Sequence, residues 1–190
     1  MNSNSNFLKK LDIFLLILFP LISVTLSLFF KVNFLTSILL FYGLPSLWFS
    51  IRTSRQILKT FIFSLFISIP FGLIADYIAT VDRAWLITST VFPFRIFGVV
   101  PIEDLIWGFF VVYSTVIVYE HFLDKGKHEL IDKRMKYLMW PLLSVLSLFL
   151  ITFFTKPEIL NLKFAYLYIG LFFFLLPTVS MLSFFPRLTL

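Results

Sequence analysis

The chain has 190 residues, of which 59% are hydrophobic and 14% are charged. Its mean hydropathy of +0.97 is far above that of a water-soluble domain. A soluble protein of this size needs many more polar side chains to cover its surface, so the composition excludes a soluble globular protein and indicates an integral membrane protein. The absence of cysteine excludes disulfides, thiolate metal sites and cysteine nucleophiles.

Apolar runs along the chain predict about six membrane-spanning helices, because one helix needs roughly 20 apolar residues to cross a bilayer. The runs cover residues 11–30, 33–50, 60–80, 100–122, 138–154 and 164–184. The first run, Leu11 to Phe30, follows Lys9 and Lys10 as in a signal peptide. Its length and the lack of a small-residue cleavage site predict an uncleaved helix instead. We therefore predict an all-α polytopic bundle that forms one membrane domain over residues 1–190.

The basic residues, which give a formal net charge of +6, are scattered among the apolar runs. This distribution is typical of topology signals in a membrane protein and argues against a nucleic-acid partner. With a cytoplasmic N-terminus, the inner positions are Lys9, Lys10, Arg52, Arg55, Lys59, Lys125, Lys127, Lys133, Arg134, Lys136 and Arg187. The outer positions are Lys31, Arg83, Arg95, Lys156 and Lys163. The excess on the inner side predicts cytoplasmic N- and C-termini in a protein of the cell membrane.

Carboxylates are the most informative polar residues, because an acid inside a membrane is costly to keep without a use. Most of the ten acids lie at cytoplasmic helix ends or in loops, where solvation or a salt bridge explains them. These are Asp12, Asp82, Glu120, Asp124, Glu129, Asp132 and Glu158. The remaining three, Asp76, Glu103 and Asp104, approach the same outer membrane face in the predicted topology. We therefore expect the functional site there.

Successive helical residues point about 100° apart, so Glu103 and Asp104 face different sides of their helix. Glu103 shares its side with aromatic residues, whereas Asp104 lies on a slim side on which another helix can pack. In a dry site the pair would hold a proton that it can donate, and in a wet site it would stay ionised. Helix capping at the membrane edge is the alternative role of the pair.

Other site types lack their sequence patterns. There is no His-x-x-x-His motif, no Asp-rich motif and no glycine-rich phosphate loop. Glu120, His121 and His128 would make a metal cluster, but their basic loop disfavours that interpretation. We expect neither a metal nor another cofactor.

A spaced acidic pattern starts at Asp76. Its elements are Asp76 at a helix end, Trp85, Gly98, the run Pro101-Ile102-Glu103-Asp104, Trp107, Gly108-Phe109-Phe110 and Tyr119-Glu120. In this pattern the segment from Asp76 to Phe122 resembles the membrane lycopene cyclase domain. That family contains heterodimeric bacterial cyclases and fused archaeal and fungal relatives, with a Pro-x-Glu-Glu/Asp signature. Ala75 departs from the family, which often has tryptophan before the aspartate.

The resemblance implies an intramolecular lyase (isomerase) that closes rings at the ends of an acyclic carotene without a cofactor. Glu103 or Asp104 would donate the proton, and Asp76 would act as partner base or charge stabiliser. Substrate contacts and cation–π faces would come from Trp85, Trp107 and Phe110.

The family motifs fall within residues 57–122, whereas residues 137–190 add two spans without a second acidic motif. Complete cyclases usually combine two such domains. The resemblance therefore implies a bilayer-embedded enzyme that acts with a second cyclase subunit, by self-association or alone. Two alternatives stay open: a non-enzymatic protein that binds or transports a lipophilic molecule, and an unrelated small membrane protein.

Overall fold

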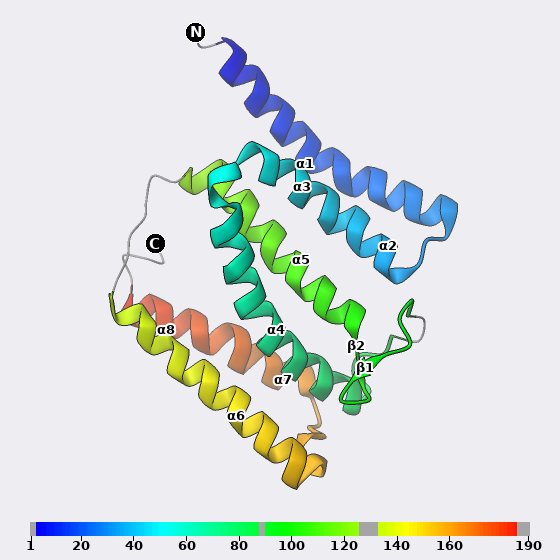
Figure 1. Ribbon diagram of the computed structural model, residues 1–190, viewed down its shortest axis with the longest axis vertical. Helices are drawn as coiled ribbons and strands as arrows, with labels where there is room; N and C mark the ends of the chain where they lie inside the picture. The colour runs from blue at the N-terminus through cyan, green and yellow to red at the C-terminus, as the bar shows by residue number, and fades with distance from the viewer. Residues whose placement is uncertain (1–2, 88–89, 126–132, 186–190) are drawn as a thin grey trace.

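The computed structural model describes residues 3–87, 90–125 and 133–185, which form long helices and one short β-hairpin (Figure 1). The elements, in chain order, are α1 (Ser3–Phe30), α2 (Phe34–Ile38), the π-helical turn η1 (Leu39–Gly43), α3 (Leu44–Arg52), the 3₁₀ turn η2 (Ser54–Gln56), α4 (Ile57–Val81), β1 (Arg95–Ile96), β2 (Val100–Pro101), α5 (Ile102–Tyr119), the π-helical turn η3 (Glu120–Asp124), the 3₁₀ helix η4 (Lys133–Leu138), α6 (Met139–Thr155), the 3₁₀ turn η5 (Pro157–Leu160), α7 (Ala165–Ile169), the π-helical turn η6 (Gly170–Leu175) and α8 (Leu176–Phe184).

Each of the six predicted spans corresponds to a helical segment, so the all-α bundle is confirmed. Within the described residues, five segments are long and apolar enough to cross a membrane. They are Phe7–Phe30, Phe34–Arg52, Ser54–Val81, Ile102–Asp124 and Ala165–Phe184. The remaining span, α6, is apolar but shorter, with 17 residues. The first helix begins at Ser3 rather than at Leu11, because the polar residues before the apolar run continue the same helix.

Helices α4 and α5 form the centre of the bundle and make its most extensive helix–helix contact. On one side, α3 packs against α5 through the buried Phe49, Tyr113 and Ile117. On the other side, α4 packs against α6 and α7 around Ile74 and Tyr77. The predicted helix pair that carries the acidic residues is therefore the structural core of the molecule.

The span predicted for residues 33–50 contains a local irregularity. Its helix passes from α2 to α3 through the π-helical turn Leu39–Gly43, and Pro45 lies in the first turn of α3. Proline has no N–H to donate to the preceding turn, which accounts for a wider turn just before it.

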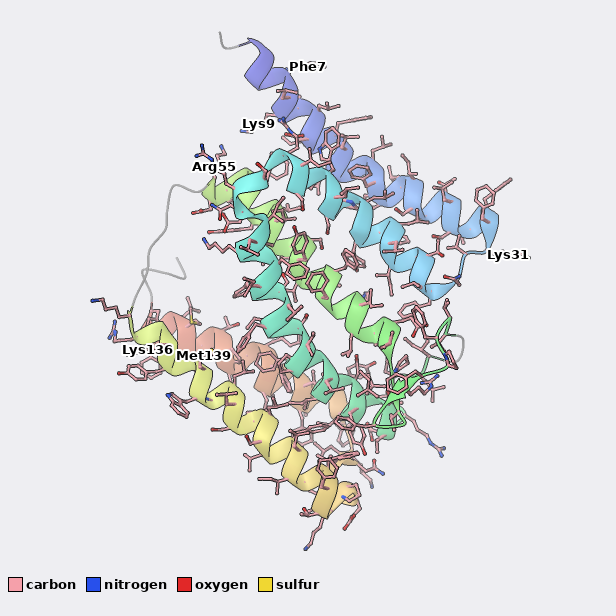
Figure 2. All side chains as sticks on the ribbon, in the orientation of Figure 1. Phe7, Lys9, Lys31, Arg55, Lys136 and Met139 are labelled. Carbon is pink, nitrogen blue, oxygen red and sulfur yellow. The ribbon has the colours of Figure 1, made fainter. Side chains whose placement is uncertain are left out.

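The two ends of the bundle differ in their connections. We call the end that contains Arg52, Arg55 and Lys125 the basic end, and the end that contains Lys31 and the β-hairpin the hairpin end. In Figure 2, Lys9, Arg55 and Lys136 lie on one side of the molecule, and Lys31 lies on the opposite side. Lys127 and Arg187, which the sequence also places on the inner side, lie outside the described residues.

A β-hairpin leads directly into α5. Its antiparallel strands pair Arg95 with Pro101 and Ile96 with Val100. The turn between them places Phe97 and Gly98 at φ values of 53° and 72°, the left-handed conformation that tight hairpin turns require. The hairpin therefore fixes where the first turn of α5, and with it the acidic pair, begins.

Candidate functional site: a buried carboxylate cluster

We call Asp76, Glu103 and Asp104 the carboxylate cluster. Glu103 and Asp104 occupy the first turn of α5, which begins after Pro101. Both side chains are buried, with exposed fractions of 0% for Glu103 and 2% for Asp104. Acids are favoured at the start of a helix because the free N–H groups there carry partial positive charge. Helix capping does not require a carboxylate to be buried. The two carboxylates also lie in different environments.

The Glu103 carboxylate holds the loop that crosses the hairpin end. Its Oε1 accepts hydrogen bonds from the backbone N–H groups of Val91, at 2.6 Å, and Phe92, at 2.9 Å. Hydrogen bonds to an ionised acceptor are among the stronger ones in proteins. Glu103 thus acts as an anchor between the loop and the start of α5.

The Asp104 carboxylate has a different environment. Neither of its oxygens makes a well-formed hydrogen bond to the residues that the structure describes. The indole of Trp85 lies beside it, and Asp76 and Arg95 lie within electrostatic reach. A buried carboxyl group without firm partners is costly, and such groups are often found where chemistry takes place.

Asp76 approaches Asp104 from the neighbouring helix α4. One turn before Asp76, Gly72 faces α5, where an added Cβ atom would make an ordinary van der Waals contact of 3.6 Å with Leu105 Cδ2. Asp76 itself is half-buried. The structure therefore brings Asp76 and Asp104 together across the α4–α5 contact, with Asp104 on the side that faces the partner helix.

Arg95 connects the cluster to the loop. Its guanidinium donates hydrogen bonds to the carbonyl oxygens of Val99, at 3.0 Å, and Ile87, at 3.1 Å. These bonds fix the guanidinium near Asp104 without giving that carboxylate a direct hydrogen bond. The sequence indicates only a topology signal at Arg95, because the position of Arg95 near Asp104 depends on a hairpin that the sequence does not predict.

Two of the three predicted substrate-contact residues lie together. The indoles of Trp85 and Trp107 are stacked, with their centroids 6.5 Å apart and their planes 26° from parallel. They keep exposed fractions of 41% and 36%. Phe110 lies elsewhere on α5, toward Gly43 in η1 and edge-on to Phe109. The structure thus places the indole pair, but not Phe110, beside the carboxylate cluster.

At the basic end lies another buried acid, Asp12, for which the sequence predicts a solvated or salt-bridged role. Asp12 is salt-bridged to Arg52 and is 1% exposed. It also accepts hydrogen bonds from the indole N–H of Trp48 and contacts His121 Nε2 at 2.9 Å. The partners come from two other helical segments, α3 and η3, so sequence spacing alone could not identify them.

No group of three or more metal-ligating side chains is found in the part of the chain that the structure describes. His121 uses both ring nitrogens, toward Thr53 Oγ1 and Asp12 Oδ2. His128, the other histidine considered as a metal ligand, lies outside the described residues.

Comparison with family models, with curated proteins and with solved structures finds no match to this chain. What the protein does must therefore be inferred from the carboxylate cluster and from the resemblance of the segment between Asp76 and Phe122.

Proposed function

We propose that this protein is a carotenoid cyclase, or one subunit of such a cyclase, that closes rings at the ends of an acyclic carotene. One observation carries the proposal. Asp104 is a buried carboxyl group without a firm hydrogen-bond partner among the described residues, placed beside a second acid, Asp76, and the Trp85 indole. An acid of this kind suits proton transfer to carbon, which ring closure requires.

The reaction divides among the residues of the cluster. Asp104 donates a proton to the terminal double bond of the carotene, which creates a carbocation. A neighbouring double bond of the same chain attacks the cation and closes the ring. Asp76 then takes a proton from the new ring and releases it to water, and Asp104 takes up another proton from water, which restores the starting state. Substrate and product are isomers, so no oxidant, reductant or cofactor is consumed.

The two indoles stabilise the charged intermediate in this scheme. A cation over the face of a tryptophan gains about 2 kcal/mol or more when water is excluded. Trp85 and Trp107 stand beside the acids and are partly exposed. A polyene dissolved in the bilayer reaches such rings sideways between helices, so it need not cross the aqueous phase.

Glu103 takes a positioning role in this proposal rather than that of proton donor. Its Oε1 already accepts two backbone hydrogen bonds, which are lost or weakened when the carboxylate is protonated. The neighbouring Asp104 has no comparable bonds to give up.

We further propose that the carboxylate cluster lies at the outer side of the cell membrane and that both termini are cytoplasmic. The distribution of basic residues supports this orientation. Since residues 137–190 contain no second acidic motif, the active form includes a second motif-bearing subunit or a second copy of this chain.

Expression in a lycopene-accumulating host, followed by chromatography of the pigments, tests the function. The wild-type chain, alone or with a motif-bearing partner, is expected to yield a cyclic carotene. Asp104→Asn keeps the side-chain size but cannot donate a carboxylic proton, and it is expected to abolish the cyclic product.

Asp82→Asn is the matched control. Asp82 lies at the same end of the bundle, where it accepts a hydrogen bond from the Ala165 N–H, outside the proposed site. The Asp82→Asn variant should retain cyclisation. Full activity of Asp104→Asn excludes Asp104 as the donor. A wild-type chain that binds carotene but yields no ring with any such partner supports the non-enzymatic alternative.

A further inference from the structure

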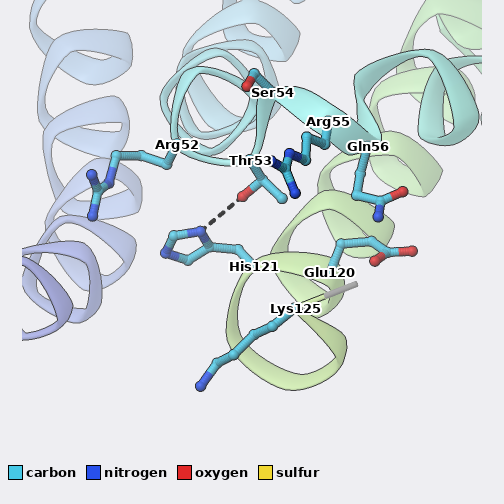
Figure 3. A pocket seen from close by; sticks show the side chains of 8 residues that line it. All are labelled: Arg52, Thr53, Ser54, Arg55, Gln56, Glu120, His121 and Lys125. Atoms are coloured by element: carbon cyan, nitrogen blue, oxygen red, sulfur yellow. Dashed lines mark hydrogen bonds between the residues drawn. The ribbon is translucent and has the colours of Figure 1, made fainter. Parts of the chain in front are cut away.

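A polar cavity of about 730 Å³ opens at the basic end, opposite the carboxylate cluster. Two short segments form its walls, residues 52–56 between α3 and α4, and residues 120–125 at the end of α5. Figure 3 shows the lining side chains, which are Arg52, Thr53, Ser54, Arg55, Gln56, Glu120, His121 and Lys125. Its volume is within the range of roughly 300–1,000 Å³ that is typical of small-molecule sites.

The acids near the cavity are balanced by some of its basic residues. The Arg52 guanidinium is held by Asp12, with Nη2 to Oδ2 at 3.2 Å. Lys59 faces Glu120 at 3.6 Å. The basic side chains Arg52, Arg55, Lys59 and Lys125 outnumber the acids Asp12, Glu120 and Asp124. The side chains in and around the cavity therefore carry a net positive charge.

Arg55 and Lys125 are the basic lining residues outside the ion pairs of Arg52 and Lys59. Neither forms an ion pair with another residue in the described ranges. They come from the two different walls of the cavity, and Ser54 and Gln56, the neighbours of Arg55 in sequence, also line it. Two cations beside neutral donors form the set that phosphate oxygens prefer.

The walls are fixed by contacts that involve neither Arg55 nor Lys125 side chains. Thr53 Oγ1 and His121 Nδ1 are 2.8 Å apart, which joins the two walls directly. His121 is held in turn by Asp12. The backbone N–H of Lys125 donates to the Glu120 carbonyl at 2.8 Å and ends the π-helical turn there. A site that is ordered in this way binds without a large entropic cost.

We propose that this basic cavity binds a phosphate group, with Arg55 and Lys125 as its charged ligands. The cavity lies at the ends of apolar helices, the depth at which lipid headgroups are found. The phosphate belongs either to a phospholipid headgroup or to a free phosphate ion. The site is independent of the proposed cyclase function, since it lies at the opposite end of the bundle.

Two probes distinguish these sources with purified full-length protein. Phosphatidylglycerol in nanodiscs tests the headgroup, and diacylglycerol with the same acyl chains is its phosphate-free control. Inorganic phosphate in detergent tests the free ion, with chloride at equal ionic strength as its control. Lipid retention is read by native mass spectrometry and phosphate binding by the shift in thermal unfolding.

The test variant is Arg55→Gln combined with Lys125→Gln. The loss of one charge-assisted contact is expected to weaken phosphate binding about tenfold. The matched control combines Lys31→Gln with Arg83→Gln, which removes two exposed cations at the hairpin end. Arg55→Lys keeps the charge and should retain most of the binding.

Binding of either probe that the test variant loses and the control retains supports the proposal, and the responding probe identifies the source. Equal binding by wild type and test variant overturns it, as does the failure of both probes to bind the wild type. Should the double variant fail to fold, Arg55→Gln and Lys125→Gln alone are each expected to lose about tenfold.

Discussion

Glu103 and Asp104 are adjacent in sequence and both buried, yet their surroundings separate their roles. Glu103 has two backbone donors, and Asp104 has none among the described residues. The sequence predicted that the two side chains face different sides of the helix, because this follows from helical geometry. It could not predict which one holds the loop, because the donors, Val91 and Phe92, belong to a segment whose path is set by tertiary contacts.

Glu103→Gln should loosen the loop at Val91 and Phe92. Glutamine retains an acceptor oxygen but lacks the negative charge, so each of the two hydrogen bonds weakens by about 1 kcal/mol. Amide hydrogen exchange of residues 90–92 is then expected to accelerate about tenfold. Hydrogen-exchange mass spectrometry measures this directly.

Asp104→Asn serves as the comparison and should leave exchange in that loop unchanged, because the Asp104 oxygens make no hydrogen bonds to it. Unchanged exchange in Glu103→Gln would remove the anchoring role of Glu103.

At the scale of elements, α1 is attached to the rest of the bundle through contacts with η1 and α3. Little of its apolar surface is buried, which is expected of a helix that faces lipid. Asp12 provides a polar attachment point, since it contacts Trp48 and Arg52 from α3 and His121 from η3. A second attachment is the hydrogen bond from Ser23 Oγ to the Leu40 carbonyl.

Asp12→Asn should therefore destabilise the attachment of α1. Breaking a fully buried ion pair costs about 3–5 kcal/mol. The side chain of Arg52 is 30% exposed, so solvent screening reduces the expected loss to about 2 kcal/mol. Thermal unfolding in detergent and proteolysis of α1 measure the effect.

Asp82→Asn is again a suitable control, because Asp82 makes one long hydrogen bond of 3.3 Å at the other end of the bundle. Equal stability of Asp12→Asn and the control would show that Asp12 does not hold α1 to the bundle.

The helices themselves could be predicted from sequence, whereas their junctions could not. Long apolar runs leave few structures other than a helix in a membrane, since each backbone polar group must be satisfied within its own segment. The hairpin before α5 depends on a left-handed Phe97, which a sequence pattern does not reveal. The π-helical turn that places Glu120 and His121 at the basic cavity is likewise a local departure from an otherwise ordinary apolar helix.

On the scale of the whole molecule, the two polar sites lie at opposite ends of the bundle. The carboxylate cluster belongs to the hairpin end and the basic cavity to the basic end. The proposed orientation puts the hairpin end outside and the basic end in the cytoplasm, where anionic lipids attract basic residues.

The cysteine-free chain allows a topology test without background labelling. Lys156→Cys, in the connection after α6, should react with a membrane-impermeant maleimide on intact cells. Lys136→Cys, in η4 before α6, should react only after the membrane is permeabilised. The opposite pattern would reverse the proposed orientation, and labelling of both in intact cells would contradict a span over α6.

The central claim is that the carboxylate cluster closes carotene rings by transferring a proton from solvent to carbon. Cyclisation in deuterium oxide, with the pigments analysed by mass spectrometry, tests it most directly. The proton that Asp104 adds stays in the product while a different proton leaves, so each ring should carry one deuterium from the solvent. A cyclic carotene without deuterium would contradict this account, as would the same labelled product from the Asp104→Asn variant.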